Sequence, residues 1–274
     1  MKPPRNVQML EKALRAMSVD DQASVMLRKT LANIVAGQFL ADAVMRGGGA
    51  LKLRYGEDAT RYTLDFDASR RVEEEVFAQN YAARLKNGWG PFSGRLVRNR
   101  KPRPADVPGE YVMRPFEVKL TYMNQAWCTV DLEVAYNEVG DAAEAELIPL
   151  SPGLLKCFSD LGLPEPEPVP LMRLAHQIAQ KLHGATDPHC FRGQDIVDLQ
   201  LIFAREKPDL SEIRDICERL FANRRRQSWP TPVAMSEELR LSYESNRGAL
   251  SVLPTAQAAV IWVNDLIKKI VLAN

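Results

Sequence analysis

The chain has 274 residues, of which 46% are hydrophobic and 26% are charged, and its formal net charge is +1. These values are ordinary for a folded globular protein, and the near-neutral balance gives no global field that would favour nucleic acid or a membrane. The four cysteines are scattered without a C-x-x-C pair, which indicates reduced thiols and a cytoplasmic protein rather than a disulfide framework.

No segment reads as a signal peptide or a membrane span. The N-terminus, MKPPRNVQMLEKALRAM, is charged and has no apolar core. The C-terminal AAVIWVNDLIKKIVLAN is the most apolar run, but charged residues interrupt it and its apolar residues recur at helical spacing. We therefore expect a packed amphipathic helix there and no membrane association.

The first part of the chain is predicted to alternate between helices and strands. Residues 5–36 should form two helices that are broken near Ser18, a residue suited to cap the second helix. A short strand is expected over residues 39–46. Further on, a helix is expected over residues 71–86, and residues 94–109 read as a loop or an excursion at the edge of a sheet.

A glycine-rich turn and a pair of aspartates lie close together in the sequence. The glycines at 47–49 precede a short predicted helix at 50–55, and residues 62–68 read as a strand that carries Asp65 and Asp67. Residues i and i+2 of a strand point to one face. Two adjacent carboxylates repel unless a cation lies between them, and Mg²⁺ binds through one or two carboxylates plus substrate phosphates. Glycine N–H groups can approach phosphate closely, so this stretch predicts a nucleoside triphosphate site.

Two further strands and then a helical half complete the predicted order. Residues 116–123 and 127–136 alternate in a strand-like way and should form a hairpin around residues 124–125. The proline-rich residues 163–168 are stiff and extended, and nearly everything after them reads as helix. We expect an α+β fold, with a mixed sheet and flanking helices over residues 1–162 and a helical domain over residues 163–274.

The helical half carries a second set of charged residues. In the predicted helix PLMRLAHQIAQKLHGA, Lys181 lies at the edge of the apolar stripe, so its stem can pack while its ammonium reaches a cleft. Such a lysine can bind a triphosphate as a point charge. Asp195 and Asp198 share a face of the next helix. Taken alone, Lys181 reads as a surface lysine, and Asp195 reads as an acid favoured at a helix N-terminus.

Together these motifs resemble the AbiEii family of nucleotidyltransferases, toxins of the polymerase β-like superfamily that includes the MenT toxins. The family's GG-x-A-L-x-L and R-[FY]-[ST]-x-D-x-D stand here as GGGALKL and RYTLDFD. Its K-L-H-A and R-x-x-D-x-x-D-L stand here as KLHG and RGQDIVDL. Four motifs in the right order are more specific than any one of them. The sequence departs from the pattern in lacking a hydroxyl residue beside the turn glycines and in having Gly184 for alanine, and its first 40 residues have no match.

For the nucleotide, the resemblance implies that Gly48 and Gly49 hold the triphosphate and that Asp65 and Asp67 bind Mg²⁺ or Mn²⁺. Arg61 belongs to the same motif and is a further nucleotide-binding candidate, although it can instead brace the aspartate strand.

For the helical half, the resemblance implies that Lys181 contacts phosphate and that Asp195 is a further catalytic acid near the metal or the acceptor. Asp198 is either a nucleotide-binding residue or the partner of a nearby base. The superfamily usually adds a third carboxylate from a neighbouring strand. Asp131 and Glu133 both qualify, and the spacing of hydrophobic residues in family members favours Glu133.

The implied activity is transfer of a nucleoside monophosphate from an NTP to an acceptor hydroxyl. The MenT resemblance points to the 3′ end of tRNA as the acceptor and to a toxin with a cognate antitoxin. Two alternatives stay open: the same chemistry on a protein or small-molecule acceptor, and a non-catalytic NTP-binding interaction protein.

Other residues have ordinary interpretations. The three histidines and Cys190 match no standard ligand spacing, so zinc is not expected. The basic residues at 95–103 and 224–226 could grip RNA or form solvated charge runs. The tryptophans, Trp229 among them, are expected in the core rather than as stacking surfaces.

Overall fold

The computed structural model describes residues 2–56, 59–63, 65–99, 113–140 and 144–273. Leu64 and the basic residues at 100–103 therefore lie outside the described residues. Contacts divide the chain into two units. Unit 1 comprises Met1–Gly56, Thr63–Asn137 and Ala143–Met172, and unit 2 comprises Glu57–Tyr62, Glu138–Ala142 and Arg173–Asn274. The sequence placed the boundary at 162/163, whereas the contacts place it after Met172, because a last strand of the sheet follows the proline-rich segment.

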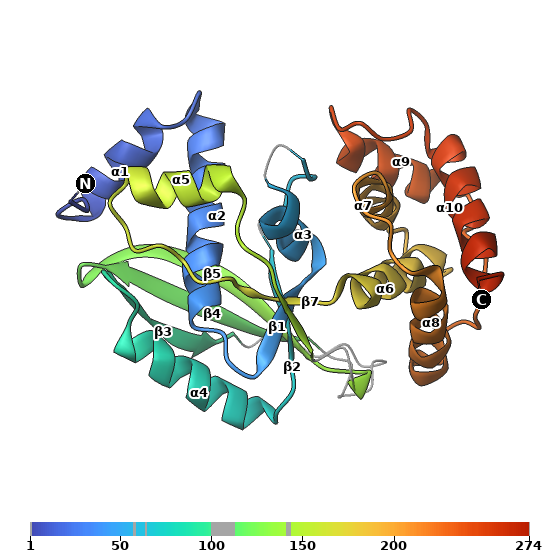
Figure 1. Cartoon of the computed structure of the whole chain (residues 1–274), viewed down its shortest axis with the longest axis horizontal. Coiled ribbons are helices and arrows are strands. Elements are labelled where there is room, and N and C mark those ends of the chain that lie inside the picture. The colour runs from blue at the N-terminus through green and yellow to red at the C-terminus, as the bar shows by residue number, and fades with distance from the viewer. Residues whose placement is uncertain (1, 57–58, 64, 100–112, 141–143, 274) are drawn as a thin grey trace. The chain divides into compact units, whose positions relative to one another are not determined.

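The described residues of unit 1 form a seven-stranded mixed sheet with the order β3-β4-β5-β2-β1-β7-β6 (Figure 1). The strands are β1 (Ala43–Arg46), β2 (Phe66–Arg70), β3 (Phe92–Arg98), β4 (Arg114–Tyr122), β5 (Gln125–Tyr136), β6 (Ala145–Leu147) and β7 (Pro170–Met172). β2 is antiparallel to β1 but parallel to β5. The α+β fold with a mixed sheet is thereby confirmed.

The helices of unit 1 are α1 (Val7–Ala16), α2 (Asp21–Gln38), α3 (Gly47–Tyr55), α4 (Glu74–Asn87) and α5 (Pro152–Asp160). The break between α1 and α2 is where the sequence predicts it, but the expected cap is wrong. Asp20 caps α2 by accepting from the N–H of Ala23 at 2.7 Å, while Ser18 donates its hydroxyl to the carbonyl of Leu14.

Helices α2 and α4 cover one face of this sheet. β4 alternates, with Phe116, Val118, Leu120 and Tyr122 buried and the residues between them partly exposed. Phe77 of α4 meets Phe116 with ring centroids 6.4 Å apart, and the Tyr81 hydroxyl donates to a carbonyl of α2 at 2.9 Å. Because apolar side chains take this face, polar side chains of the same strands point to the other one.

Three strand predictions shift in their details. The hairpin between β4 and β5 turns at Met123 and Asn124, both with positive φ, one residue earlier than expected. β1 begins only at Ala43, because α2 continues to Gln38. Residues 94–98 of the segment expected to be a loop or an excursion at a sheet edge belong to β3, which is an edge strand of the sheet.

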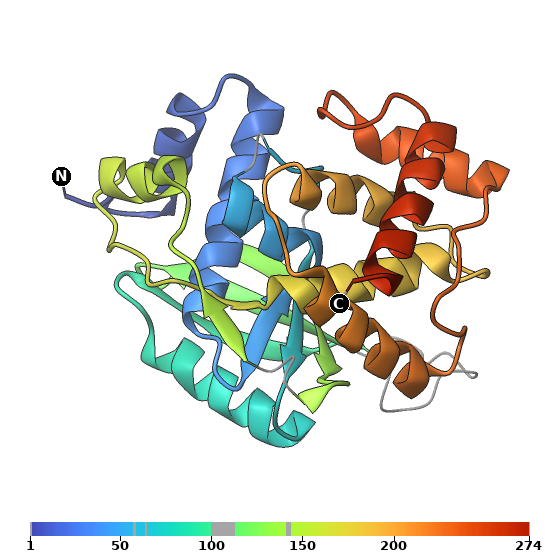
Figure 2. The ribbon, with the colours of Figure 1, turned by 45° about the vertical axis from the view of Figure 1, so that its right-hand side comes forward.

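The described part of unit 2 is helical (Figure 2). It contains α6 (Leu174–Thr186), α7 (Gly193–Phe203), α8 (Leu210–Arg224), α9 (Glu237–Arg247) and α10 (Ala256–Val271). The predicted C-terminal amphipathic helix is α10, which buries Ala259, Val263 and Ile267 among others. Nowhere in the described residues is there a helix with the length and hydropathy needed to cross a membrane.

Candidate functional site

The three glycines form the first turn of α3 instead of a turn that precedes it. The N-cap is Arg46, whose side chain makes no capping hydrogen bond. The first N–H groups of a helix have no partner within the helix, and the helix dipole places positive potential there. The start of α3 therefore has the polarity of an anion site.

Glycine is required at the first position of this turn. Gly47 has a φ of +71°, and a Cβ there would lie 2.7 Å from Oδ2 of Asp67. Both the backbone conformation and the space exclude an ordinary side chain. The helix N-terminus and the Asp67 carboxylate are thus in direct proximity.

A second contact joins this helix to Asp65. A Cβ on Gly49 would lie 2.7 Å from the main-chain oxygen of Asp65. Lys52, which is buried, donates to the carbonyl of Thr63 at 2.8 Å. The Thr63 hydroxyl in turn lies 3.1 Å from Oδ2 of Asp65. These contacts fix the segment that leads into β2 and orient the Asp65 carboxylate.

The two aspartates do not share a strand, contrary to the prediction for residues 62–68. β2 begins at Phe66, so Asp65 precedes it and is exposed, while Asp67 lies within it. Both aspartates nevertheless lie against the first turn of α3. Gly49 contacts the main chain of Asp65, and Gly47 contacts the side chain of Asp67.

Neighbouring strands add an acid and a base beside Asp67. Asp67 is paired in register with Glu133 of β5 on one side and with Arg46 of β1 on the other. Phe66 and Ala68 are buried, so this row lies on the sheet face away from the apolar core. On its other side β5 pairs with β4, where Glu133 meets Pro115 and Asp131 meets Glu117, so of the two acids only Glu133 is in register with a residue of β2. Register therefore favours Glu133 over Asp131 as the third carboxylate.

The donors in this region fit a hard cation. Carboxylate oxygens from Asp65, Asp67 and Glu133 are the ligands that Mg²⁺ and Mn²⁺ prefer. Among the residues that the structure describes, no three His, Cys, Asp or Glu side chains are grouped closely enough to hold a metal ion by themselves. Mg²⁺ in general binds through few protein ligands and takes others from water and substrate phosphates.

The remaining predicted residues form a buried ionic cluster in unit 2. Nζ of Lys181 lies 2.5 Å from Oδ2 of Asp198 and 3.4 Å from Oδ1 of Asp195. Nε of Arg61 lies 3.0 Å from Oδ1 of Asp198, and Nε of Arg192 lies 2.6 Å from Oδ2 of Asp195. The Lys181 side chain is only 6% exposed. Its ammonium is thus shared between the two acids that follow it in the motif order.

Gly184 lies against this cluster, where a larger residue would not fit. A Cβ at this position would lie 2.5 Å from Oδ2 of Asp195 and 3.0 Å from Nε of Arg192. Since both atoms are held by their mutual ion pair, alanine would displace them. The change from KLHA to KLHG therefore makes room for the present position of Asp195.

The predicted site residues divide between the units. Gly48, Gly49, Asp65, Asp67 and Glu133 lie in unit 1, and Arg61, Lys181, Asp195 and Asp198 lie in unit 2. The sequence analysis missed two residues of unit 1, Arg46 and Lys52. Arg46 directly precedes the glycines, and Lys52 stands alone among apolar residues in GGGALKL, which was the available signal for a buried lysine.

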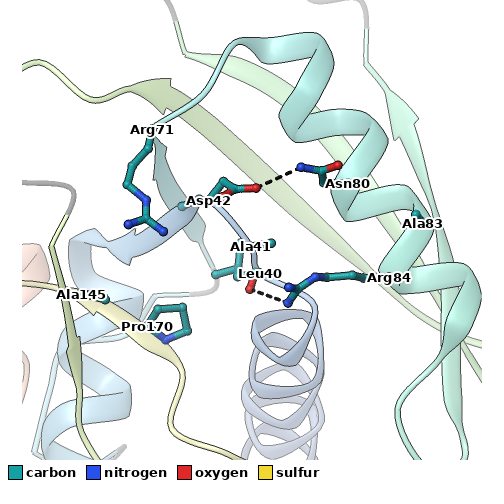
Figure 3. Close-up of a pocket in the computed structure, with 10 residues that line it drawn as sticks. Leu40, Ala41, Asp42, Arg71, Asn80, Ala83, Arg84, Ala145 and Pro170 are labelled. Atoms are coloured by element: carbon teal, nitrogen blue, oxygen red, sulfur yellow. Dashed lines mark hydrogen bonds between the residues drawn. The ribbon is translucent and has the colours of Figure 1, made fainter.

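A separate cavity of about 540 Å³ lies at the beginning of β1, whereas the glycines follow its end (Figure 3). Two of its polar side chains already bond to the protein. Asn80 donates to Asp42 at 3.0 Å, and Arg84 donates to the carbonyl of Leu40 at 3.4 Å. These two bonds belong to the fold, and the Arg71 side chain lines the same cavity.

Comparison with solved structures gives the fold class. MenT4, a nucleotidyltransferase toxin from Mycobacterium tuberculosis, is similar over 96% of this chain and 99% of that chain, with a TM-score of 0.54 and 15% identity. JHP933 from Helicobacter pylori covers 92% of this chain and 93% of its own, with a TM-score of 0.49 and 15% identity. The likeness to MenT4 shows a shared fold. No curated protein matches the sequence.

The family follows from a sequence profile. The profile described as nucleotidyl transferase AbiEii toxin, type IV TA system, matches residues 29–259. The protein is a nucleotidyltransferase. It belongs to the AbiEii family, the nucleotidyltransferase toxins of type IV toxin–antitoxin systems. The resemblance drawn from the four motifs is confirmed, and membership implies an NTP substrate and an antitoxin partner.

Proposed function

We propose that the protein transfers a nucleoside monophosphate from an NTP to a hydroxyl at the 3′ end of tRNA, with Mg²⁺ or Mn²⁺ as cofactor. The observation that carries the proposal is the convergence of the N-terminus of α3 with Asp65 and Asp67. An anion-binding helix start beside two carboxylates suits a metal-bound triphosphate. The tRNA acceptor rests on resemblance alone.

The chain's own residues have these proposed roles. The N–H groups of Gly48 and Gly49 bind the triphosphate, and Asp65, Asp67 and Glu133 hold the metal. When bound, the metal supplies neutralisation of phosphate charge and activation of the acceptor oxygen. Thr63 keeps the Asp65 carboxylate oriented through its hydroxyl.

Unit 2 is proposed to supply the roles that the resemblance implies. Lys181 contacts phosphate, Asp195 is a further acid, and Arg61 and Asp198 are nucleotide-binding. The ion pairs of Lys181 support a preformed position for its ammonium, because two carboxylates restrict its rotamers. The scattered cysteines, all four of them free, support a cytoplasmic setting.

The test is transfer of label from each α-³²P-labelled NTP, with Mg²⁺ or Mn²⁺, onto separate pools of tRNA, protein and small molecules. The expected result is labelled tRNA. Label in protein alone would support the protein acceptor and end the tRNA version. Absence of transfer despite NTP binding would support a non-catalytic binding protein.

A matched pair of variants tests the carboxylates. Glu133→Gln should lower transfer by about 100-fold or more, the scale for losing one preorganised electrostatic group. Asp131→Asn removes the same charge two residues away on β5, on the same strand face but out of register with Asp67, and should leave transfer near the wild-type rate. Equal losses in both variants would contradict the role of Glu133.

A further inference from the structure

Unit 2 contains a cavity that the proposed chemistry does not use. It has a volume of about 570 Å³ and lies at the end of α8. Its lining combines an aromatic wall, arginines and small polar groups, namely Glu218, Phe221, Ala222, Arg225, Arg226, Gln227, Ser228 and Trp229. The volume is in the range of small-ligand pockets.

The aromatic side of the cavity is Trp229, which packs against a buried aromatic ring. Trp229 meets Phe221 with ring centroids 5.1 Å apart at 60°, and Phe221 meets His183 at 4.7 Å and 62°. Trp229 is only half-buried, contrary to the expectation that it belongs to the core. Its indole N–H donates to no residue that the structure describes. Phe221 therefore supports the indole while part of the ring and its donor stay available.

The segment beside Trp229 is anchored to α6. Gln227 donates to the carbonyl of His183 at 2.8 Å and to the hydroxyl of Thr186 at 3.1 Å. Arg226 lies 3.2 Å from Oδ2 of Asp187, which is buried. These bonds give the cavity a fixed wall, so that a ligand would not have to order it.

Arg225 is the uncommitted cation of this cavity. It is exposed and forms an ion pair with none of the described residues. It also ends α8 with a φ of 53° and a ψ of 25°, a left-handed position that usually takes glycine or asparagine. The fold thus keeps an arginine where its backbone is disfavoured, and its guanidinium lines the same cavity as the indole.

We propose that this cavity binds an unpaired nucleotide of an RNA strand, with the base against Trp229 and a backbone phosphate on Arg225. Aromatic stacking of bases and arginine contacts to phosphate are the two usual elements of single-strand recognition. Glu218 is the one acid in the lining, against two arginines, which suits an anionic ligand. The inference deepens the proposed function, because the strand bound here is the acceptor RNA.

Binding is measured on the full chain without NTP, so that the result is independent of nucleotide transfer. The probe is a fluorescein-labelled single-stranded RNA of about ten nucleotides, the scale of single-strand binding sites. Trp229→Ala should weaken binding by about tenfold or more, the scale of one lost base stack. Trp229→Phe keeps an aromatic face and should stay within about threefold of wild type.

The phosphate contact has its own control. Arg225→Gln should weaken binding and lower the slope of log affinity against log salt by about 0.7, as for one phosphate contact to a single strand. Arg5→Gln removes the same charge from an exposed arginine of unit 1 and should change neither. Irradiation of a 4-thiouridine-labelled RNA should crosslink the peptide that contains Trp229.

Several results would overturn the inference while leaving the nucleotidyltransferase reaction standing. These are no RNA binding by wild type, wild-type affinity in both Trp229→Ala and Arg225→Gln, or crosslinks confined to other peptides. Competition by free AMP at the concentration of the RNA would make the cavity a mononucleotide site and would also refute it. If Trp229→Ala does not fold, as judged by circular dichroism, Arg225→Gln and the crosslink still decide.

Discussion

The buried ionic cluster predicts that its acids matter more for folding than its lysine. Lys181, Arg61 and Arg192 carry three positive charges against the two negative charges of Asp195 and Asp198. Asp198 is the shared partner of Lys181 and Arg61, and its side chain is 1% exposed. The consequences of removing an acid or the lysine can therefore be compared directly.

Asp198→Ala leaves two cations without their main partner. Lys181 would keep only Asp195, at 3.4 Å, and Arg61 would lose both of its contacts to the carboxylate. Removing one partner of a buried ion pair typically costs about 3–5 kcal/mol of unfolding free energy. Lys181→Met, by contrast, leaves each acid with a cation, because Asp195 keeps Arg192 and Asp198 keeps Arg61. A near-isosteric apolar replacement of this kind should cost less than about 1.5 kcal/mol.

The assay is urea unfolding of both variants and of the double variant, followed by circular dichroism. The double variant should be more stable than Asp198→Ala alone by about 1–2 kcal/mol, because it no longer buries a lysine that has lost its nearer partner. If Asp198→Ala costs no more than Lys181→Met, or if the two losses simply add, the cluster does not act as described.

Three further predictions concern single residues. Burial and the adjacent Arg224 lower the pKa of His183 to about 3. Because the unfolded chain therefore binds a proton at a higher pH than the folded chain, the unfolding free energy should drop by about 2 kcal/mol between about pH 7.5 and pH 5. Urea titrations at both pH values should show this loss in the wild type and not in His183→Gln. Gly47→Ala meets Asp67 and a positive φ, so it should lower the unfolding free energy by about 1–2 kcal/mol and reduce nucleotide transfer; wild-type transfer would contradict the placement of α3. Gly193→Ala would put a Cβ 2.2 Å from the main-chain nitrogen of Tyr243 and should lower the unfolding free energy by about 1–3 kcal/mol. Gly153→Ala, whose Cβ would have nothing within 4 Å, should raise it by about 0.5–1 kcal/mol. Urea unfolding of the two variants distinguishes the effect of packing from that of helix propensity.

Local pattern was enough to predict the main elements of unit 1. The apolar spacing of α4 and the alternation of β4 and β5 each correspond to a buried face in the structure. The limits of elements were less predictable. The glycines at 47–49 read as a turn from local propensity, yet they begin α3. Gly47 and Gly49 approach Asp67 and Asp65 so closely that a Cβ would lie 2.7 Å from an oxygen of each. A tertiary contact of that kind has no signal in the helix's own sequence.

The sequence indicated which residues are candidates for the site, but not how they are arranged in space. The motif identified Asp67, but only strand register shows that Glu133, and not Asp131, lies beside it. The apolar stripe of α6 predicted that the stem of Lys181 packs while its ammonium reaches a cleft, whereas the structure pairs the buried ammonium with Asp195 and Asp198. The pairing of Asp198 with both Lys181 and Arg61 joins residues 137 positions apart, and no periodicity could indicate it.

Two short segments, 57–62 and 138–142, belong to unit 2 although they lie within the sequence of unit 1. This matters for any attempt to express the units separately. Arg61 and Glu138 lie in these segments, and they pair with Asp198 and Arg224 of the helical unit. A fragment cut at the end of β7 would carry the helices but lack both counterions. We expect such a fragment to express poorly, and a functional split of the gene would need to return both short segments to the helical half.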